Sequence, residues 1–323
     1  FAVDLSKSFP YSYALVRIKN GQIGESRRSR RRFFTSVPGM LLAGMIAVGI
    51  VNVARYILAK KEVKSSLLEL VESKREKVDG KLGEMKAEAL RLSNLEIPRS
   101  ALADYRADKG GLEELQAASV PVFESAINES GEMLGVARCS TAGGAIVEAG
   151  VAIPRDRLLF PTVGAGDPFI RGPFQFQNEQ RVIVGVPVFD GNVIEGMDAV
   201  LFSLSGLQPL VSDYSGLGEK GEMILGVARG KISEMFFSRR TATENGDPDG
   251  LIADALGKTI QGSSGVALGK GTDGQPVMIG YTPLLEADWG LIVRIAGEGS
   301  AIEDPEYWSA TGLAVSGGVF LGT

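Results

Sequence analysis

The sequence predicts an α+β fold in which a long helix precedes two similar antiparallel sheets, with a membrane-spanning helix on each side. Three observations lead to this prediction. Residues 33–54 form an uncharged run, a helical seam of apolar residues follows it, and two strand-like segments recur in the same order about 91 to 95 residues later. Together they indicate a membrane-anchored chain whose folded part contains an internal duplication.

Composition limits the chemistry that this chain can carry. Its 323 residues are enough for about two domains, and 44% of them are hydrophobic, so most of the chain can bury a core. Histidine is absent and Cys139 is the single cysteine, which removes the commonest general base, any intrachain disulfide and the usual zinc ligands. The net charge of −5 gives no sign of nucleic-acid binding. We therefore expect no metal or cofactor, no nucleic acid as a partner, and no enzyme within these residues.

The first part of the chain has the pattern of a membrane anchor. Residues 33–54 contain no charged side chain, and at about 1.5 Å per residue such a helix is roughly 33 Å long, enough to cross a hydrocarbon core. A basic cluster just before the run places residues 1–32 in the cytoplasm. The cluster consists of Arg27, Arg28, Arg30, Arg31 and Arg32. We expect a transmembrane helix over 33–59; the alternative, a buried core helix, seldom has so long an uncharged run.

A second helical pattern covers residues 60–100. Apolar residues recur at spacings of 4, 7, 4, 3, 4 and 3, the period of a helical seam, and charged residues occupy the other faces. Pro98 is expected to end this stalk helix. The seam packs either on the chain's own domains or on a second copy as a dimer stalk, and the pattern leaves both roles open. The apolar seam consists of Leu67, Val71, Val78, Leu82, Met85, Ala89 and Leu92.

An internal repeat is the strongest signal beyond the stalk helix. The segment Leu134–Arg138 recurs with identical residues as Leu225–Arg229, at an offset of 91. A strand-like segment around Gly185 resembles one around Gly280, at an offset of 95. Two matches in the same order, at nearly one offset, indicate two copies of one fold.

Alternation and turn residues predict a sheet in each copy. A helix precedes the strands of each copy, and 205–218 is the expected linker between the two. In the first copy, 101–210, we expect strands over 132–138, 181–188 and 192–204, with a hairpin at Asp190-Gly191. In the second copy, 211–300, we expect strands over 222–229, 231–236, 266–270, 275–283 and 289–295, and a helix over 251–260.

The last residues have the pattern of a second membrane helix. Acidic residues precede Tyr307 and Trp308, and the 15 residues from Ser309 to Thr323 carry no charge. This order is typical of a helix that enters a bilayer from outside. Because 15 residues are too few to span, we expect 306–323 to begin a helix that a longer protein completes. Residues 60–305 are then extracytoplasmic, outside a bacterial inner membrane.

This order of elements resembles double Cache sensor domains, in which tandem PAS-like units lie between two membrane helices. The resemblance covers roughly residues 60–297. It implies that a membrane-distal unit (101–210) binds a small molecule, that a membrane-proximal unit (211–300) follows, and that the signal passes through the second membrane helix to an output module. The residues that carry it are the segments Gly185–Gly191, Leu217–Glu222, Tyr281–Leu284 and Trp289–Leu291.

A PAS-like sheet forms a concave pocket, for which arginines and phenylalanines of the distal unit are the candidate lining. The arginine fork binds carboxylates and the aromatic rings supply an apolar wall. The candidate ligand-binding residues are Arg157, Arg171, Phe174, Phe176, Phe189 and Asp198. Arg138 is a further candidate, but its repeat equivalent Arg229 favours a structural role for both.

The candidate pocket departs from the family's amino-acid-binding members in one respect. Those members carry a Trp-Tyr pair close to their arginine, and a later tyrosine and aspartate. Here the stretch Asp156 to Phe176 contains no Trp or Tyr, and Asp198 is one register away from the expected acidic position. Amino-acid recognition of that particular type is therefore not expected.

The sequence as a whole predicts the sensor region of a bacterial signal-transduction receptor, of the kind used in chemotaxis and two-component systems. It would contact the lipid bilayer, bind a small molecule, and form a homodimer through the stalk and membrane helices. The alternative is a structural or accessory subunit of a larger membrane assembly, in which the PAS-like units make only protein contacts. An output domain after Thr323, which could itself be catalytic, would favour the receptor.

Overall fold

The computed structural model describes residues 37–141, 144–158, 166–177, 179–191, 193–218, 221–229, 232–237, 240, 250–270 and 276–296. The predictions for 1–32 and 306–323 lie outside these residues. The helices are α2 (Val37–Ser93), α3 (Glu96–Arg106), α4 (Leu112–Glu129), the 3₁₀ turn η2 (Arg155–Arg157), α5 (Gln208–Val211) and α6 (Gly250–Ile260). The first five strands are β1 (Met133–Ser140), β2 (Ala145–Gly150), β3 (Phe169–Phe176), β4 (Glu179–Asp190) and β5 (Val193–Ser203). The second five are β6 (Glu222–Arg229), β7 (Ile232–Met235), β8 (Gly265–Lys270), β9 (Pro276–Pro283) and β10 (Gly290–Ala296).

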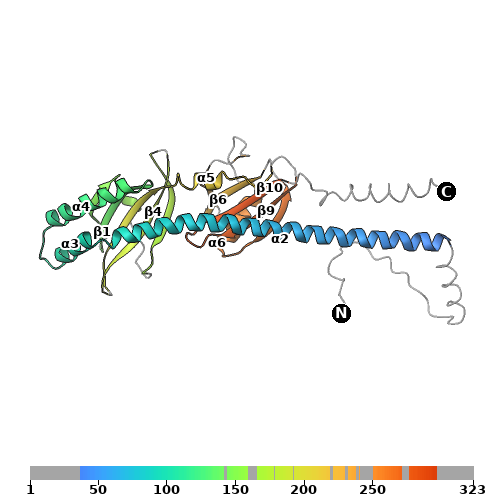
Figure 1. Cartoon of the computed structure of the whole chain (residues 1–323), viewed down its shortest axis with the longest axis horizontal. Helices are drawn as coiled ribbons and strands as arrows, with labels where there is room; N and C mark the ends of the chain where they lie inside the picture. Colours follow the sequence, from blue (N-terminus) through green and yellow to red (C-terminus); the bar gives the residue numbers. More distant parts are fainter. Residues whose placement is uncertain are drawn as a thin grey trace. The chain divides into compact units, whose positions relative to one another are not determined.

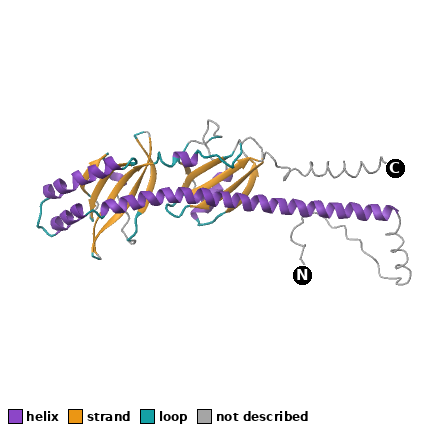
Figure 2. Ribbon diagram, viewed as in Figure 1, coloured by secondary structure: helices purple, strands orange, loops and turns teal. Residues whose placement is uncertain are grey.

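The two sheets have one topology, which confirms the predicted duplication (Figures 1 and 2). Their strand orders are β2-β1-β5-β4-β3 and β7-β6-β10-β9-β8, and all neighbours are antiparallel. The repeated LGVAR segment lies in β1 and again in β6, and Gly185 and Gly280 lie in β4 and β9. The distal unit below means α3, α4 and β1 to β5, and the proximal unit means β6 to β10 with α6.

The stalk seam is buried against the chain's own sheets. All seven predicted seam residues are at most 3% exposed, and they join one core with residues of both sheets. A methyl group at Gly280 would collide with Val71, so α2 lies directly on β9 there. The helix ends at Ser93, before Pro98. Pro98 instead lies in the first turn of α3, where a missing backbone N–H leaves no hydrogen bond unmade.

Polar contacts also fix α2 to both units. The Lys74 ammonium lies 2.7 Å from the Asp213 carboxylate, after α5, and the Lys81 ammonium lies 2.9 Å from Glu132, before β1. The Asp79 carboxylate accepts hydrogen bonds from two backbone amides of the β9–β10 turn, those of residues 285 and 286, at 3.0 and 3.2 Å. In that turn, Glu286 forms an ion pair with Lys86 at 3.0 Å. One helix is thus held by both units within about four turns.

The predicted first membrane helix falls within α2 from Val37 onward. Of the described residues, 37–58 belong to one compact body and 59–296 to another, so that almost all of the described part of the predicted membrane helix and the two sheets belong to different bodies. Of the helices in the described ranges, none is both long and apolar enough to cross a bilayer.

Each sheet presents two faces because successive strand residues point to opposite sides. In β4, Val182, Val184 and Val186 belong to the core that contains α2, whereas Ile183 belongs to a separate cluster on the other side. In β10, Leu291 and Val293 face α2 and Ile292 faces α6. The face of each sheet away from α2 is called its outer face.

Candidate functional site

The outer face of the distal sheet has a small, apolar floor. It is covered from above by Ile153 and Leu158, which lie in the β2–β3 connection, and by Phe174 of β3. These three side chains are at most 6% exposed. The floor consists of Ala137, Cys139, Ile183, Met197, Ala199 and Leu201.

Three of the predicted site residues come together on this face. The Arg157 guanidinium carbon lies 5.1 Å from the centre of the Phe174 ring, at a distance typical of a cation–π contact. Arg171 of β3 donates a hydrogen bond to the backbone oxygen of Arg157 at 3.4 Å. The two arginines therefore adjoin each other at the rim of an apolar cluster. Arg157 also lies 3.0 Å from Asp156, but both side chains of this pair are exposed, so the pairing is weak.

The two remaining phenylalanines take different positions. Phe176 is half-buried and packs against the same outer cluster as Phe174. Phe189 lies at the far end of β4, where its ring is close to Gly166 and its backbone oxygen accepts a hydrogen bond from Arg99 of α3 at 3.0 Å. Phe189 also lines a cavity of about 260 Å³ beside α3. The structure thus separates Phe189 from the arginine pair.

Asp198 lies on the opposite face of the sheet, toward the helices. Its neighbours Met197 and Ala199 point to the outer face, so alternation turns Asp198 inward. Both carboxylate oxygens accept hydrogen bonds from Arg138 at 2.7 Å, and both side chains are fully buried. Arg138 also donates to the Pro98 carbonyl and lies 5.2 Å from the ring centre of Phe123. The pair therefore ties α3 and α4 to the sheet, in agreement with the structural role expected for Arg138.

Cys139 lies in the floor with its thiol in the protonated form. Burial, together with the nearby carboxylates of Asp198 and Glu148, raises its pKa to about 12. A thiol with this pKa is a poor nucleophile and a poor metal ligand at neutral pH. Cys139 therefore contributes to the site as a small apolar side chain.

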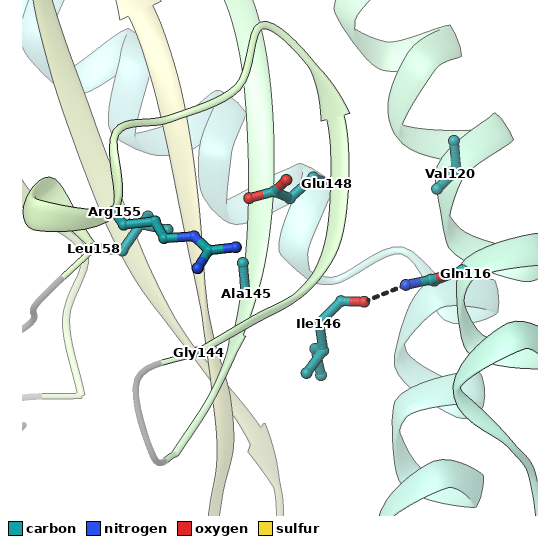
Figure 3. Close-up of a pocket in the computed structure, with 8 residues that line it drawn as sticks. All are labelled: Gln116, Val120, Gly144, Ala145, Ile146, Glu148, Arg155 and Leu158. Carbon is teal, nitrogen blue, oxygen red and sulfur yellow. Dashed lines mark hydrogen bonds between the residues drawn. The ribbon is translucent and has the colours of Figure 1, made fainter.

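A cavity of about 450 Å³ opens beside this cluster, at the edge strand β2. Figure 3 shows Arg155 and Glu148 near each other on one side of β2, and Gln116 of α4 on the other side. The Gln116 amide donates to the backbone oxygen of Ile146 at 2.9 Å. None of these three residues is among the candidates predicted from the sequence. No motif marks them, since they come from a helix, a strand and a loop that only the tertiary fold brings together.

The outer face of the proximal sheet is occupied by a helix instead. Leu256 and Ile252 of α6 are buried against Ile224, Ile279 and Ile292 of the sheet. Glycines let α6 approach closely, since a methyl group at Gly290 would overlap Thr259, and one at Gly226 would lie 3.0 Å from Leu256. The apolar positions of this sheet are therefore filled by the chain itself.

Two antiparallel sheets of one topology, with a long helix packed on both, give this chain a tandem PAS-like fold. Solved structures with the same fold include the ligand-binding domain of the Campylobacter jejuni chemoreceptor Tlp3. In complex with L-norvaline it gives a TM-score of 0.53 at 12% identity, over 76% of this chain and 95% of that chain. In complex with 4-methylisoleucine it gives 0.51 at 11% identity, over 75% and 93%.

The extracellular part of a putative histidine kinase has a similar fold. The extracellular domain of the putative histidine kinase rpHK1S-Z16 gives a TM-score of 0.51 at 13% identity, over 76% of this chain and 98% of that chain. No protein-family model matches the sequence, and no curated protein sequence does. At these identities the comparisons establish the fold.

Proposed function

We propose that this chain is the extracytoplasmic sensor region of a bacterial membrane receptor and that it binds a small molecule on the outer face of the distal unit. The difference between the two outer faces carries this proposal. The proximal face is filled by α6, whereas the distal face is covered by a connection and has two arginines at its rim. A face that the chain does not fill with its own helix is the one suited to a ligand.

The chemistry of the distal face supports a ligand that has a carboxylate and an apolar body. Arg157 and Arg171 adjoin each other, and an arginine fork donates paired hydrogen bonds to a carboxylate. Phe174 and Phe176 offer apolar surface next to them. The Tlp3 domain, which shares this fold, was crystallised with L-norvaline, a molecule with those two features.

We also propose that residues 33–59 anchor the chain in the bacterial inner membrane. The run 33–54 has no charged residue and follows five arginines. In its described part, large apolar side chains of α2 are at least half exposed, which is unfavourable in water and favourable in lipid. These are Met45, Val48, Ile50, Val51 and Val53.

A fusion to alkaline phosphatase tests this topology. The enzyme fused after Ala296 should be active, because it works only outside the cytoplasm, and an inactive fusion would contradict the topology.

A homodimer that signals through residues 306–323 completes the proposal. Leu68 and Leu90 of α2 are each 40% exposed and lie off the buried seam, so they are available for a second copy. A ligand that changed the packing of the two copies would alter the spacing of their membrane helices.

Thermal unfolding of the fragment 59–304 tests the ligand site. Short-chain amino acids and aliphatic monocarboxylates, including L-norvaline, are the probes. A binding probe should raise the Tm, and Arg157→Ala or Arg171→Ala should abolish most of that rise, since each removes a guanidinium from the rim. Arg106→Ala is the matched control, because Arg106 is exposed on α3 and pairs with Glu195. If a probe stabilises both rim variants as strongly as the parent, the site is elsewhere.

A further inference from the structure

Strand β3 contains a bulge, Gly172 and Pro173, between two residues of the proposed ligand site. Arg171 and Phe174 are three residues apart on β3, but their partners on β4 are only two residues apart. Gly172 has a φ of 124°, a conformation that residues with a side chain rarely adopt. A bulge beside a binding site alters where the neighbouring side chains point. The position of the bulge is therefore linked to the positions of Arg171 and Phe174.

The bulge also forms a hydrogen bond with the proximal unit. The Gly172 carbonyl accepts it from the indole N–H of Trp289, the residue before β10, at 3.0 Å. Trp289 is 3% exposed, and its ring packs edge-on against Phe236 with 4.9 Å between the ring centres. A buried donor is costly to leave unpaired, so the indole N–H must either keep this carbonyl or reach water.

Trp289 belongs to a β9–β10 turn that its own hydrogen bonds hold together. The Leu284 N–H donates to the Trp289 carbonyl at 2.9 Å, and the Trp289 N–H donates to the Ala287 carbonyl at 2.7 Å. The turn is also bound to α2, because the Asp79 carboxylate accepts hydrogen bonds from two of its backbone amides at 3.0 and 3.2 Å. It leads directly into β10, which precedes residues 306–323. The turn thus contacts both elements that lead toward the proposed membrane helices.

A cavity of about 470 Å³ lies beside the contact between Gly172 and Trp289. Arg171 and Gly172 line it from the distal unit. Ala287 and Trp289 line it from the turn. Close-packed interiors resist displacement, whereas open space beside a contact lets the two partners shift. Arg171 also borders the rim of the distal face, where it donates to the backbone oxygen of Arg157 at 3.4 Å. A carboxylate at this rim would offer Arg171 stronger, charge-assisted hydrogen bonds.

We propose that the hydrogen bond between Gly172 and Trp289 couples the distal ligand site to the proximal unit, an inference that rests on the ligand site proposed above. A carboxylate on the distal face draws Arg171 toward it, and the bulge follows because Gly172 is the next residue. The hydrogen bond to the indole is then lost, and the indole N–H meets water in the cavity. The turn is released from the distal unit while α2 still holds it. Trp289 is thus a positioning residue, which acts through its acceptor and touches no ligand.

Tryptophan fluorescence tests the coupling without a ligand. In the whole chain with Trp308→Phe, Trp289 is the sole tryptophan, so the emission reports its surroundings alone. Phe174→Leu loosens the packing beside the bulge. It should move the emission maximum to longer wavelength and increase quenching by acrylamide, since the indole meets water more often. Phe123→Leu is the matched control, because it makes the same change in a fully buried residue of α4 on the other face of the distal sheet. It should leave the emission unchanged.

L-norvaline and aliphatic monocarboxylates test the coupling with a ligand. A probe that raises the Tm of the whole chain should also move the Trp289 emission to longer wavelength. In isothermal titration the same probe should bind Trp289→Phe about fivefold more tightly than the parent, or tighter still, because this variant has no bond to break. If the indole only stabilised the fold, Trp289→Phe would lower the Tm and leave the affinity unchanged.

Two results would overturn the coupling. In the first, Phe174→Leu shifts the emission no more than Phe123→Leu does. In the second, a probe that raises the Tm leaves the emission unchanged or binds Trp289→Phe no more tightly than the parent. If no probe raises the Tm, the carboxylate site of the distal unit fails on its own, and the two phenylalanine variants still decide whether the distal face is coupled to Trp289.

Discussion

The distal and proximal units share one strand order, but different elements cover their outer faces. In the proximal unit α6 lies on the sheet, and glycines at 226 and 290 allow its side chains to reach the strands. In the distal unit the equivalent face carries a connection with a single 3₁₀ turn, and its floor is built of small side chains such as Ala137 and Ala199. The same fold thus has one outer face covered by a helix and one covered by a loop connection.

The buried ion pairs of the two units show a related difference. In the distal unit, Arg138 on β1 pairs with Asp198 on β5. In the proximal unit the acid, Glu222, is on β6 and the arginine, Arg294, is on β10, with 3.1 Å between the charged atoms. The partners have exchanged strands, but each unit keeps one pair between its two central strands. Each unit therefore has one buried ion pair between the same two strands, but the repeat aligns Arg138 with Arg229 and not with Glu222, so the pairs lie at different positions along those strands.

The largest effect is expected from breaking the distal ion pair. Asp198→Ala leaves the Arg138 guanidinium buried without a countercharge and should lower the free energy of unfolding by about 3–5 kcal/mol. Glu195→Ala, on the same strand, breaks a partly exposed pair with Arg106 and should cost about 1 kcal/mol or less. Denaturant unfolding measures both. Similar losses in the two variants would contradict a special role for the buried pair.

The second-largest effect on stability is expected from truncating Leu256, the α6 side chain that packs on the proximal sheet. Leu256→Ala should lower the free energy of unfolding by about 2–5 kcal/mol, because Leu256 is fully buried and its loss leaves a cavity. Ile260→Ala, in the same helix, changes a side chain that is 49% exposed and should stay within about 0.5 kcal/mol. A small loss for Leu256→Ala would contradict the tight packing of α6 on the proximal sheet.

A hydrogen bond between the units should have a smaller effect. The Trp289 indole N–H donates to the backbone oxygen of Gly172 on β3 at 3.0 Å. Trp289→Phe keeps an aromatic ring but removes the donor, so the free energy of unfolding should fall by about 0.5–1.5 kcal/mol from the hydrogen bond, with a further loss for the smaller ring. Hydrogen exchange of β3 amides should become faster in the variant, and unchanged exchange would show that the bond does not hold the units together.

The smallest effect at neutral pH comes from Cys139 and appears only in alkali. Its pKa is raised from 9.0 to about 12 in the folded chain. Below pH 9 the thiol is protonated in both states; above it the unfolded chain releases the proton first, so stability falls as the pH rises from 9 toward 12. Cys139→Ala should lack this part of the decline when unfolding is followed between pH 8 and 10.5. An identical decline in both proteins would place the thiol in contact with water.

The sequence predicted those helices and strands in which burial follows the regular period of the element. The stalk seam was readable because every third or fourth residue is buried, and β6 because its residues alternate between α2 and α6. Strand β3 was missed, since Gly172-Pro173 interrupts it; the fold tolerates this proline because β3 is an edge strand with an irregular register between Arg171 and Phe174. Strand β2 is a six-residue edge strand and has a similarly weak signal.

The site was predictable by residue type more than by position. Arg157, Arg171 and Phe174 were chosen for their chemistry, and the fold brings them together although they lie in a loop and a strand. Asp198 was chosen for its charge, but the side on which a strand residue points depends on register, and a shift of one residue reverses it.

The polar contacts of α2 restrict how its length can vary. Lys74, Asp79, Lys81 and Lys86 engage different units from successive turns of one helix. Inserting or deleting one residue among them rotates everything beyond that point by about 100°, and some of these partners then face the wrong way. Changes ahead of Leu67, by contrast, leave the seam and every one of these contacts in phase. We therefore expect natural length variation in this helix to fall before Leu67, where it leaves the alignment of the two units on the helix unchanged.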